Sequence, residues 1–175
     1  MDWHKEAHNF FMPVSSPENI KFIADAMLGR LARWLRFLGF DTVYYPHISD
    51  TQLIRIAREK DRFVLTRDTR LIMEKGIHDS YLLIHANDTM KQLYEVIDSL
   101  KLKHFNLLSR CVSCNGQLLR ITDKIEIKDI VPEFIFLNIA DFQKCSDCGK
   151  IYWEGSHPKN FREKLNDLLK LSKET

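Results

Sequence analysis

Short apolar runs alternate with stretches of helical periodicity between residues 22 and 100. Strands that are covered on both faces are apolar at nearly every position, and the short runs fit that pattern. They predict strands at 22–24, 42–45, 63–66 and 81–84. In the stretches between them, apolar residues recur three or four positions apart, as on the buried face of a helix. These stretches predict helices at 27–38, 50–60, 69–75 and from 88 to about 100. Such alternation predicts an α/β fold, a parallel sheet flanked by helices.

Local signals support two of these helices. Gly39 follows the apolar face of the first one, and glycine commonly ends helices because it tolerates a positive φ. Ser49 and Gln52 have the spacing of a capping box, in which each side chain accepts a hydrogen bond from the other residue's backbone N–H. The second helix is therefore expected to begin directly after Ser49.

Four cysteines form two pairs with the same spacing, Cys111 with Cys114 and Cys145 with Cys148. Each C-x-x-C turn can present two thiolates to one metal ion, and two such turns complete a tetrahedral zinc site. Four protein ligands leave no open position, so this zinc is expected to be structural. Two disulfides or a redox pair are the alternatives. They are less consistent with an N-terminus that lacks a secretory signal, which predicts a reducing compartment.

The alternation of strands and helices stops at about residue 105, which divides the chain into four segments. We predict an N-terminal arm at 1–21, the α/β domain at 22–105, a zinc ribbon at 106–156 and a C-terminal helix at 157–175. Tyr152 and Trp153 are expected to cover the ribbon or to pack it onto the α/β domain.

Composition narrows the function classes. The chain has 175 residues, 45% of them hydrophobic and 29% charged, which is ordinary for a globular protein. Its longest apolar stretches fall far short of the roughly 20 residues that span a bilayer, so we expect no membrane association and a cytoplasmic location. The net charge of +2 is too small to indicate nucleic acid by itself. That argument depends on where the charges lie.

An acid follows each of the four predicted strands: Asp25, Asp50, Asp68 and Asp88. The carboxyl ends of parallel strands meet at one edge of the sheet, where ligands bind in open α/β sheets. Carboxylates gathered there repel one another, and a divalent cation such as Mg²⁺ or Mn²⁺ removes that repulsion. Such a site suits metal-assisted hydrolysis of a phosphodiester. The alternative is that each acid caps a helix or lies in its first turn, which explains Asp88 fully.

Positive charge accompanies these acids. Arg30, Arg33 and Arg36 recur on the first predicted helix, and Arg67 precedes Asp68. Arginine forms forked hydrogen bonds with phosphate oxygens, so these four residues are candidates for nucleic-acid binding. The alternative is a solvated helix face.

Several stretches resemble one known family. They run from Phe22 through Asp25 to Asp41, from Ser49 to Leu53 and from Arg62 to Asp68, and they include the paired cysteines and the stretch from Cys148 to His157. In this order, over roughly residues 22–160, they resemble the PIN-like RNase domain family named after the C-terminal part of the Mut-seven exonuclease. The resemblance implies a PIN-like three-layer fold, metal-dependent RNase activity and an appended zinc ribbon.

By position, the resemblance implies that Asp25, Asp50 and Asp68 bind the catalytic metal. PIN domains often carry glutamate in the second position, and Asp50 departs from that pattern. A fourth acid is usual in the family, and Asp88 is the choice in this sequence.

The main hypothesis is a metal-dependent endoribonuclease that uses Mg²⁺ or Mn²⁺, with the ribbon helping to dock RNA or a ribonucleoprotein partner. The alternative is a catalytically inactive PIN-like module that binds RNA or a ribonucleoprotein. A phosphoryl-transfer α/β enzyme is disfavoured, because the haloacid-type phosphatase pattern needs a second Asp where Met27 stands. The sequence makes no prediction of the oligomeric state.

Overall fold

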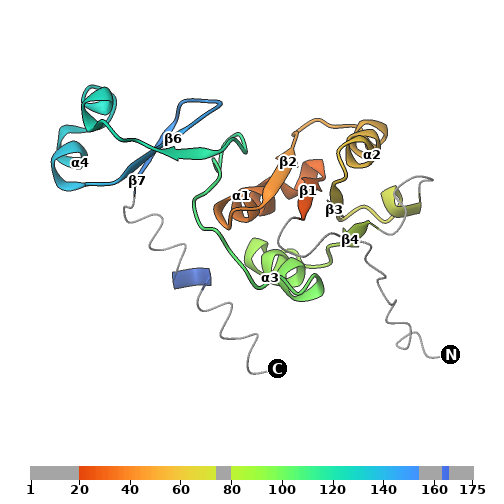
Figure 1. Ribbon diagram of the computed structural model, residues 1–175. Helices are drawn as coiled ribbons and strands as arrows, with labels where there is room; N and C mark the ends of the chain where they lie inside the picture. Colours follow the sequence, from red (N-terminus) through yellow and green to blue (C-terminus); the bar gives the residue numbers. More distant parts are fainter. Residues whose placement is uncertain (1–19, 74–79, 154–162, 166–175) are drawn as a thin grey trace.

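The computed structural model describes residues 20–73, 80–153 and 163–165. The first part of the chain forms the alternating elements β1 (Lys21–Ala24), η2 (Ala26–Leu28), α1 (Gly29–Phe37), β2 (Asp41–Tyr44), α2 (Asp50–Glu59), β3 (Phe63–Thr66), η3 (Leu71–Met73), β4 (Tyr81–Leu83) and α3 (Thr89–Ser99). The second part forms β5 (Leu118–Arg120), η4 (Lys124–Ile127), α4 (Glu133–Asn138), β6 (Phe142–Cys145) and β7 (Ile151–Trp153). Figure 1 shows β5–β7 and α4 extending away from the α/β part.

The four strands of the α/β part form one sheet in the order β2-β1-β3-β4, and every pair is parallel. Ile23 lies at the centre of this sheet, opposite Val43 on one side and Val64 on the other. The predicted parallel sheet flanked by helices is therefore confirmed.

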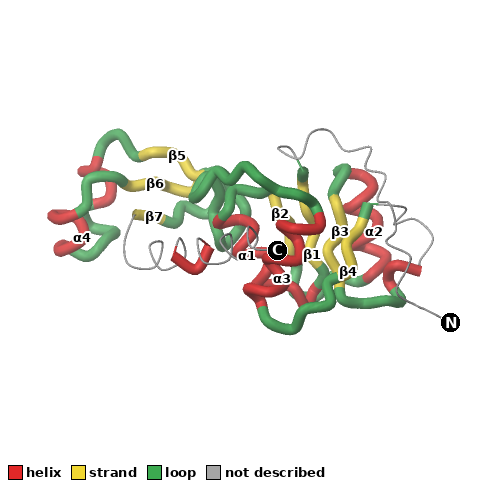
Figure 2. Tube along the Cα trace, turned by 90° about the horizontal axis from the view of Figure 1, so that it is seen from below, coloured by secondary structure: helices red, strands yellow, loops and turns green. Residues whose placement is uncertain are grey.

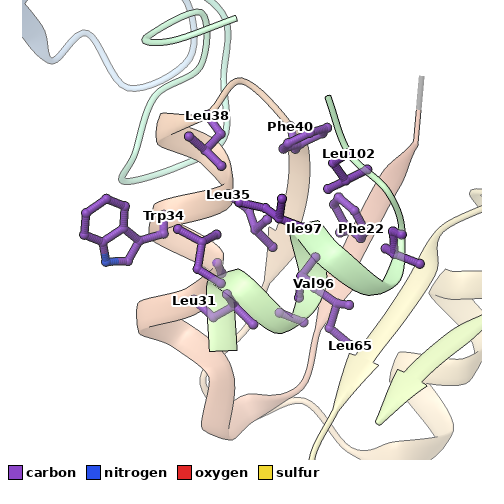
Figure 3. Packing of buried hydrophobic residues seen from close by; sticks show 14 of the residues in the cluster. Phe22, Leu31, Trp34, Leu35, Leu38, Phe40, Leu65, Val96, Ile97 and Leu102 are labelled. Carbon is purple, nitrogen blue, oxygen red and sulfur yellow. The ribbon is translucent and has the colours of Figure 1, made fainter. Parts of the chain in front are cut away.

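Helices cover both faces of this sheet. Side chains of α1 and α3 pack on one face in a large apolar cluster, part of which is drawn in Figure 3. At its centre, the rings of Phe22 and Phe40 meet edge to face with 5.6 Å between centroids. On the opposite face, Leu53 and Ala57 of α2 pack against Ile23 and Val64. The helix periodicity predicted these buried faces.

The local signals act as expected at two helix ends. Ser49 and Gln52 form a complete capping box at the start of α2. Gly39 ends α1 with a φ of +97°, and a Cβ there would lie 2.3 Å from the Asn106 carbonyl oxygen. Glycine is thus required both by the backbone conformation and by the close approach of the chain that leads to the ribbon.

Two helices differ from their expected lengths. The first begins as the 3-10 turn η2, because the Asp25 side chain caps Ala26, and the α-helix starts only at Gly29. Of the helix expected at 69–75, the described residues form only the short turn η3, and 74–79 lie outside the described residues. Residues 1–19 and most of the expected terminal helix also lie outside them, although Leu165 is buried in the large cluster.

The ribbon is a separate antiparallel sheet with the order β5-β6-β7, whose three strands lie one above another beside the α/β part in Figure 2. The segment between its cysteine pairs forms β5, η4 and α4 before β6, so it contains helix as well as strand. Trp153 packs against Phe142 in a small cluster, and Tyr152 contacts the cysteines. Both aromatic residues therefore cover the ribbon.

Candidate active site and metal centre

Asp25 lies at the carboxyl end of the central strand β1 and is only 8% exposed. Its Oδ1 accepts a hydrogen bond from the Ala26 N–H (2.5 Å), and its Oδ2 accepts one from the Thr66 hydroxyl (2.7 Å). A buried carboxylate with so few neutral donors keeps lone pairs for a further partner. Asp25 therefore helps to cap η2, as the alternative interpretation held, but that role does not use all of its bonding capacity.

Asp68 follows the neighbouring strand β3 and is joined to Asp25 through Thr66. The Thr66 hydroxyl donates to Asp25 and accepts the backbone N–H of Asp68 (3.0 Å). The Arg70 backbone N–H donates to Asp68 Oδ1 (2.8 Å), and this bond lowers the pKa of Asp68 below its usual value. Asp68 is therefore ionised throughout the neutral range.

Asp50 and Asp88 occupy different places from this pair. Asp50 is exposed in the first turn of α2, where no hydrogen bond or ion pair joins it to another described residue. Asp88 is the N-cap of α3, and its Oδ1 accepts the N–H groups of Met90 and Lys91. The geometry of Asp88 is that of an ordinary helix cap.

The acids do not form a closed cage for a metal. Among the described residues, the cysteines are the one group of three or more His, Cys, Asp or Glu ligand atoms lying within 4.8 Å of one another. Magnesium, however, is usually held by one or two carboxylates together with water and substrate phosphate. Asp25 and Asp68, which follow adjacent strands and are connected through Thr66, supply the ligand type that this mode of binding uses.

Three of the four candidate arginines line one hollow beside this edge. Arg30 and Arg33 of α1 and Arg67 after β3 surround a cavity of about 510 Å³, which also reaches Asn87 and Gln92 near the start of α3. Arg30 and Arg33 make no ion pair within the described part of the chain. Arg67 donates to the Asn87 side-chain oxygen. The arrangement presents three cations to one space.

Arg36 has a different role from the one that the sequence suggested. Its side chain is 5% exposed, and it donates through Nε to the Thr42 carbonyl (2.8 Å) and through Nη1 to the carbonyls of Val112 (3.1 Å) and Ser113 (2.8 Å). Arg36 is therefore a structural link between α1, β2 and the first cysteine turn. Because it is buried, with Nε and Nη1 bonded inside the protein, Arg36 does not line the hollow with the other three arginines.

The four cysteines come together as the spacing predicted, and none forms a disulfide. The sulfurs of Cys111 and Cys148 lie 3.6 Å apart, and those of Cys114 and Cys145 lie 3.4 Å apart. Four thiolates bound to one zinc at about 2.3 Å would be about 3.8 Å apart in a tetrahedron. The cluster therefore has the size and ligand type of a structural zinc site.

The protonation of these sulfurs also favours a cation. Burial alone would raise the pKa of Cys111, but hydrogen bonds from the Tyr152 hydroxyl and from the N–H groups of Cys114 and Ser113 outweigh it and lower the pKa to about 6. Burial and the neighbouring sulfurs raise the pKa of Cys114 to about 12. The four sulfurs cannot all be thiolates at neutral pH unless a bound metal compensates their charge.

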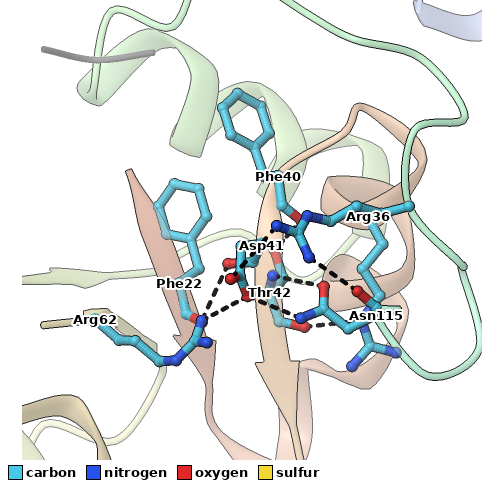
Figure 4. Close-up of polar contacts among 8 residues, drawn as sticks. Phe22, Arg36, Phe40, Asp41, Thr42, Arg62 and Asn115 are labelled. Carbon is cyan, nitrogen blue, oxygen red and sulfur yellow. Dashed lines mark hydrogen bonds and ion pairs between the residues drawn. The ribbon is translucent and has the colours of Figure 1, made fainter. Parts of the chain in front are cut away.

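The first cysteine turn is attached to the free edge of the parallel sheet, as Figure 4 shows. Asn115 Oδ1 accepts the Thr42 N–H (2.9 Å), while Arg36 binds the Thr42 carbonyl. Asp41 accepts from Asn115 (2.8 Å) and from Arg62 (2.7 Å). Burial alone would raise the pKa of Asp41, but these two hydrogen bonds outweigh it and lower the pKa. The ribbon turn thus satisfies backbone groups that an edge strand would otherwise expose.

Sequence reasoning missed three contributors to this geometry. Thr66 was assigned only to a strand, although its hydroxyl joins the two acids. Asn115 lies in the first cysteine turn with a φ of +76°, and its amide also binds β2. Glu95 of α3 accepts the N–H groups of His85 and Ala86 and fixes the loop that leads to the hollow. Of these three, only Thr66 offered a sequence signal, because it lies between an apolar run and the Arg67-Asp68 pair.

No helix in the described part of the chain has the length and apolar character needed to cross a membrane. No curated protein matches the sequence. A family model described as the Mut7-C RNAse domain matches residues 20–165. The matched range includes the whole parallel sheet, the Asp25–Thr66–Asp68 connection, the arginine-lined hollow and all four cysteines, so it covers both halves of the molecule. A family of this description indicates a nuclease-like function, and the resemblance seen in the motifs is confirmed: the chain belongs to the Mut7-C RNAse domain family.

Proposed function

We propose that this protein is a metal-dependent endoribonuclease with a PIN-like α/β fold, which hydrolyses phosphodiester bonds of RNA at the edge formed by Asp25 and Asp68. One observation carries the proposal. The Thr66 hydroxyl binds the Asp25 carboxylate and the Asp68 backbone N–H, and these two acids lie at the same sheet edge as three arginines that form no ion pair with a carboxylate of the described residues. This chemistry requires carboxylates that bind a metal ion and, next to them, cationic side chains that bind the phosphate.

In this proposal, Asp25 and Asp68 hold Mg²⁺ or Mn²⁺, and Asp50 is a third, outer ligand that acts through water. Such an ion, when bound, supplies an activated water and neutralises charge on the phosphate. Thr66 has a positioning role, because its hydroxyl fixes the orientation of the Asp25 carboxylate. The N–H of Arg70 keeps Asp68 ionised and ready to bind a cation.

The arginines hold the RNA backbone beside that edge. Arg30 and Arg33 lie one turn apart on α1, and Arg67 precedes Asp68 by one residue. A phosphate bound by these guanidinium groups would bring the adjoining bond to the two carboxylates. Asp88 has no assigned catalytic role here, because the cap of α3 uses it.

The zinc ribbon, in this proposal, docks a partner protein of a ribonucleoprotein. Its far end, residues 121–141, carries five carboxylates and two lysines, so it repels a phosphate backbone. Phe134 and Leu137 are 73% and 70% exposed on the outer side of α4. Apolar side chains among carboxylates suit a basic protein surface better than RNA.

The direct test is cleavage of a mixed set of labelled RNAs with Mg²⁺, with Mn²⁺ and without a divalent cation. We expect metal-dependent cutting by the parent protein. We expect Asp25→Asn and Asp68→Asn to lose about 100-fold or more in rate, because each removes a ligand charge from the site. The matched control is Asp98→Asn, which removes an exposed carboxylate from the far part of α3. All variants are purified in parallel so that a contaminating nuclease would be seen in each.

Two results would contradict the proposal. Cutting that persists unchanged in Asp25→Asn and Asp68→Asn would remove these acids from catalysis. RNA binding with no cutting under any metal condition would favour the inactive RNA-binding module instead. Asp50→Asn separates the two-ligand from the three-ligand arrangement, because only the latter predicts a loss of rate.

A further inference from the structure

The arginine-lined hollow contains an unusual excess of one charge. Three guanidinium groups line it, and no lining residue is a carboxylate. The Nε of Arg67 is buried and has no hydrogen-bond partner among the residues that the structure describes. Like charges held together, with a buried donor left unpaired, are unfavourable unless an anion enters. The hollow therefore favours an anionic ligand.

Its shape limits what that anion can be. A volume of about 510 Å³ lies within the range of pockets that enclose small ligands. The Tyr44 ring forms one wall, and a Cβ on Gly29 would approach it to 2.7 Å. The hydroxyl of Tyr44 donates to the Ala26 carbonyl (3.0 Å), which holds the ring there. A hollow with fixed walls of this size can take one nucleotide, whereas a base that is stacked in a duplex cannot enter it.

Two amide side chains supply neutral hydrogen-bonding groups beside the arginines. Asn87 uses its oxygen to bind Arg67, which leaves its NH₂ group as a donor. Gln92 uses its NH₂ group to bind the Ala86 carbonyl (3.0 Å), which leaves its oxygen as an acceptor. A free donor and a free acceptor side by side can recognise the polar edge of a base or a ribose hydroxyl.

We propose that this hollow binds one unpaired nucleotide of the RNA, with its phosphate on Arg30, Arg33 and Arg67 and its base or ribose against Asn87 and Gln92. The substrate class is then single-stranded RNA. The inference rests on the proposed function, because it places the strand that enters the hollow next to the Asp25–Asp68 edge. Duplex RNA lacks a nucleotide that can enter without unpairing.

The test measures binding apart from cleavage. Fluorescence anisotropy compares a short labelled single strand with the same strand annealed to its complement, without added divalent cation. We expect the single strand to bind about tenfold or more tightly, because unpairing a base opposes duplex binding. Adenosine 5′-monophosphate is expected to displace the strand better than adenosine or inorganic phosphate, because only the nucleotide uses both parts of the hollow.

A charge-matched pair of double variants locates the binding. Arg30→Gln with Arg33→Gln should weaken single-strand binding by about 10- to 100-fold, since each change removes charged hydrogen bonds to phosphate. Arg55→Gln with Arg58→Gln removes the same charge at the same spacing from exposed positions of α2, on the other face of the sheet, and should change binding little. Gln92→Met should reduce the advantage of the nucleotide over phosphate.

Equal binding of single strand and duplex, or equal competition by phosphate and nucleotide, would overturn the inference. Equal losses in the two double variants would do the same. Cleavage of single strand and duplex at the same rate would overturn it while leaving the proposed nuclease intact. Single-strand binding at the hollow without any cleavage would support the inference and contradict the nuclease.

Discussion

The α/β part and the ribbon differ in what holds each of them together. In the α/β part, 20 buried residues, together with Leu165 from the C-terminal segment, form one apolar cluster that includes residues of the sheet, α1 and α3. In the ribbon, two clusters contain three buried residues each, and one of them includes Cys111 and Cys145. A small core seldom suffices for stability, and small modules commonly add a metal. The comparison indicates that burial stabilises the first region, and we expect a zinc ion held by the four cysteines to stabilise the second.

The two regions also differ in their surfaces. The sheet edge of the α/β part gathers three arginines that form no ion pair with the described residues around a hollow, whereas the far end of the ribbon gathers carboxylates and exposed apolar side chains. They meet at Thr42, where Arg36 and Asn115 bind both backbone groups of an edge strand. In the proposed function, the nucleic-acid chemistry therefore lies on the α/β part, and the ribbon is joined to it at Thr42.

The largest expected effect follows from breaking the zinc centre. Cys145→Ser should abolish stoichiometric zinc binding and unfold the ribbon, because structural zinc contributes about 10–16 kcal/mol of binding energy in small domains. Hydrogen exchange read by mass spectrometry should show peptides from 111–153 losing protection while β1 and β3 keep theirs. A matched Ser146→Ala, at an exposed non-ligand position, should leave both regions unchanged. Equal loss of protection in both regions would contradict the comparison.

Removing apolar volume from the core should destabilise the α/β part and leave the metal centre of the ribbon intact. Leu35→Ala in the large cluster should lower the free energy of unfolding by about 2–5 kcal/mol, without altering the zinc content. Leu35 is fully buried. Leu137→Ala, at an exposed position of α4, should change stability by less than about 0.5 kcal/mol. Denaturant unfolding with metal analysis of the same samples checks both expectations.

Two arginines one turn apart on α1 allow the two regions to be tested separately. Arg36 binds the first cysteine turn of the ribbon, and Arg33 lines the hollow. Arg36→Met should destabilise the protein by about 1–3 kcal/mol, because the buried carbonyl of Thr42 and the carbonyl of Ser113 lose their donor. Arg33→Met should leave stability unchanged and weaken RNA binding instead. Thermal unfolding should therefore change only in Arg36→Met, and RNA binding measured by fluorescence anisotropy should change mainly in Arg33→Met. Identical effects of the two changes would mean that the contacts of Arg36 with Thr42 and Ser113 do not contribute to the stability of the protein.

Arg33 and Arg36 also show how much of the fold and of the candidate site the sequence could predict. Periodicity and local capping signals predicted the parallel sheet, both buried helix faces and the start of α2, because these depend on residues close in the chain. The paired cysteines predicted their cluster, since a metal site imposes its own ligand spacing. Arg33 and Arg36, by contrast, belong to the same three-residue repeat and cannot be told apart by pattern.

The difference between the two arginines arises from contacts distant in sequence. Arg36 binds carbonyls 76 and 77 residues away, in a turn whose position depends on how the ribbon meets β2. Asp25 and Asp68 are likewise joined by a threonine hydroxyl 41 residues from Asp25. Such partners follow from the folded arrangement, so the sequence could name the candidate residues without stating which would meet.

The smallest expected effect is a pH dependence of the junction. Asp41 has a pKa below its usual value, because the hydrogen bonds from Arg62 and Asn115 outweigh the effect of burial. A carboxylate with a lowered folded-state pKa stabilises the folded protein above its unfolded-state pKa of about 4 and loses that contribution as the pH falls below it. Asp41→Asn cannot titrate, so its stability should decline less steeply between about pH 5 and pH 3 than that of the parent. Urea unfolding at each pH measures the difference between the two proteins, in which zinc loss common to both cancels. Parallel pH profiles would show that Asp41 does not stabilise the junction through its charge.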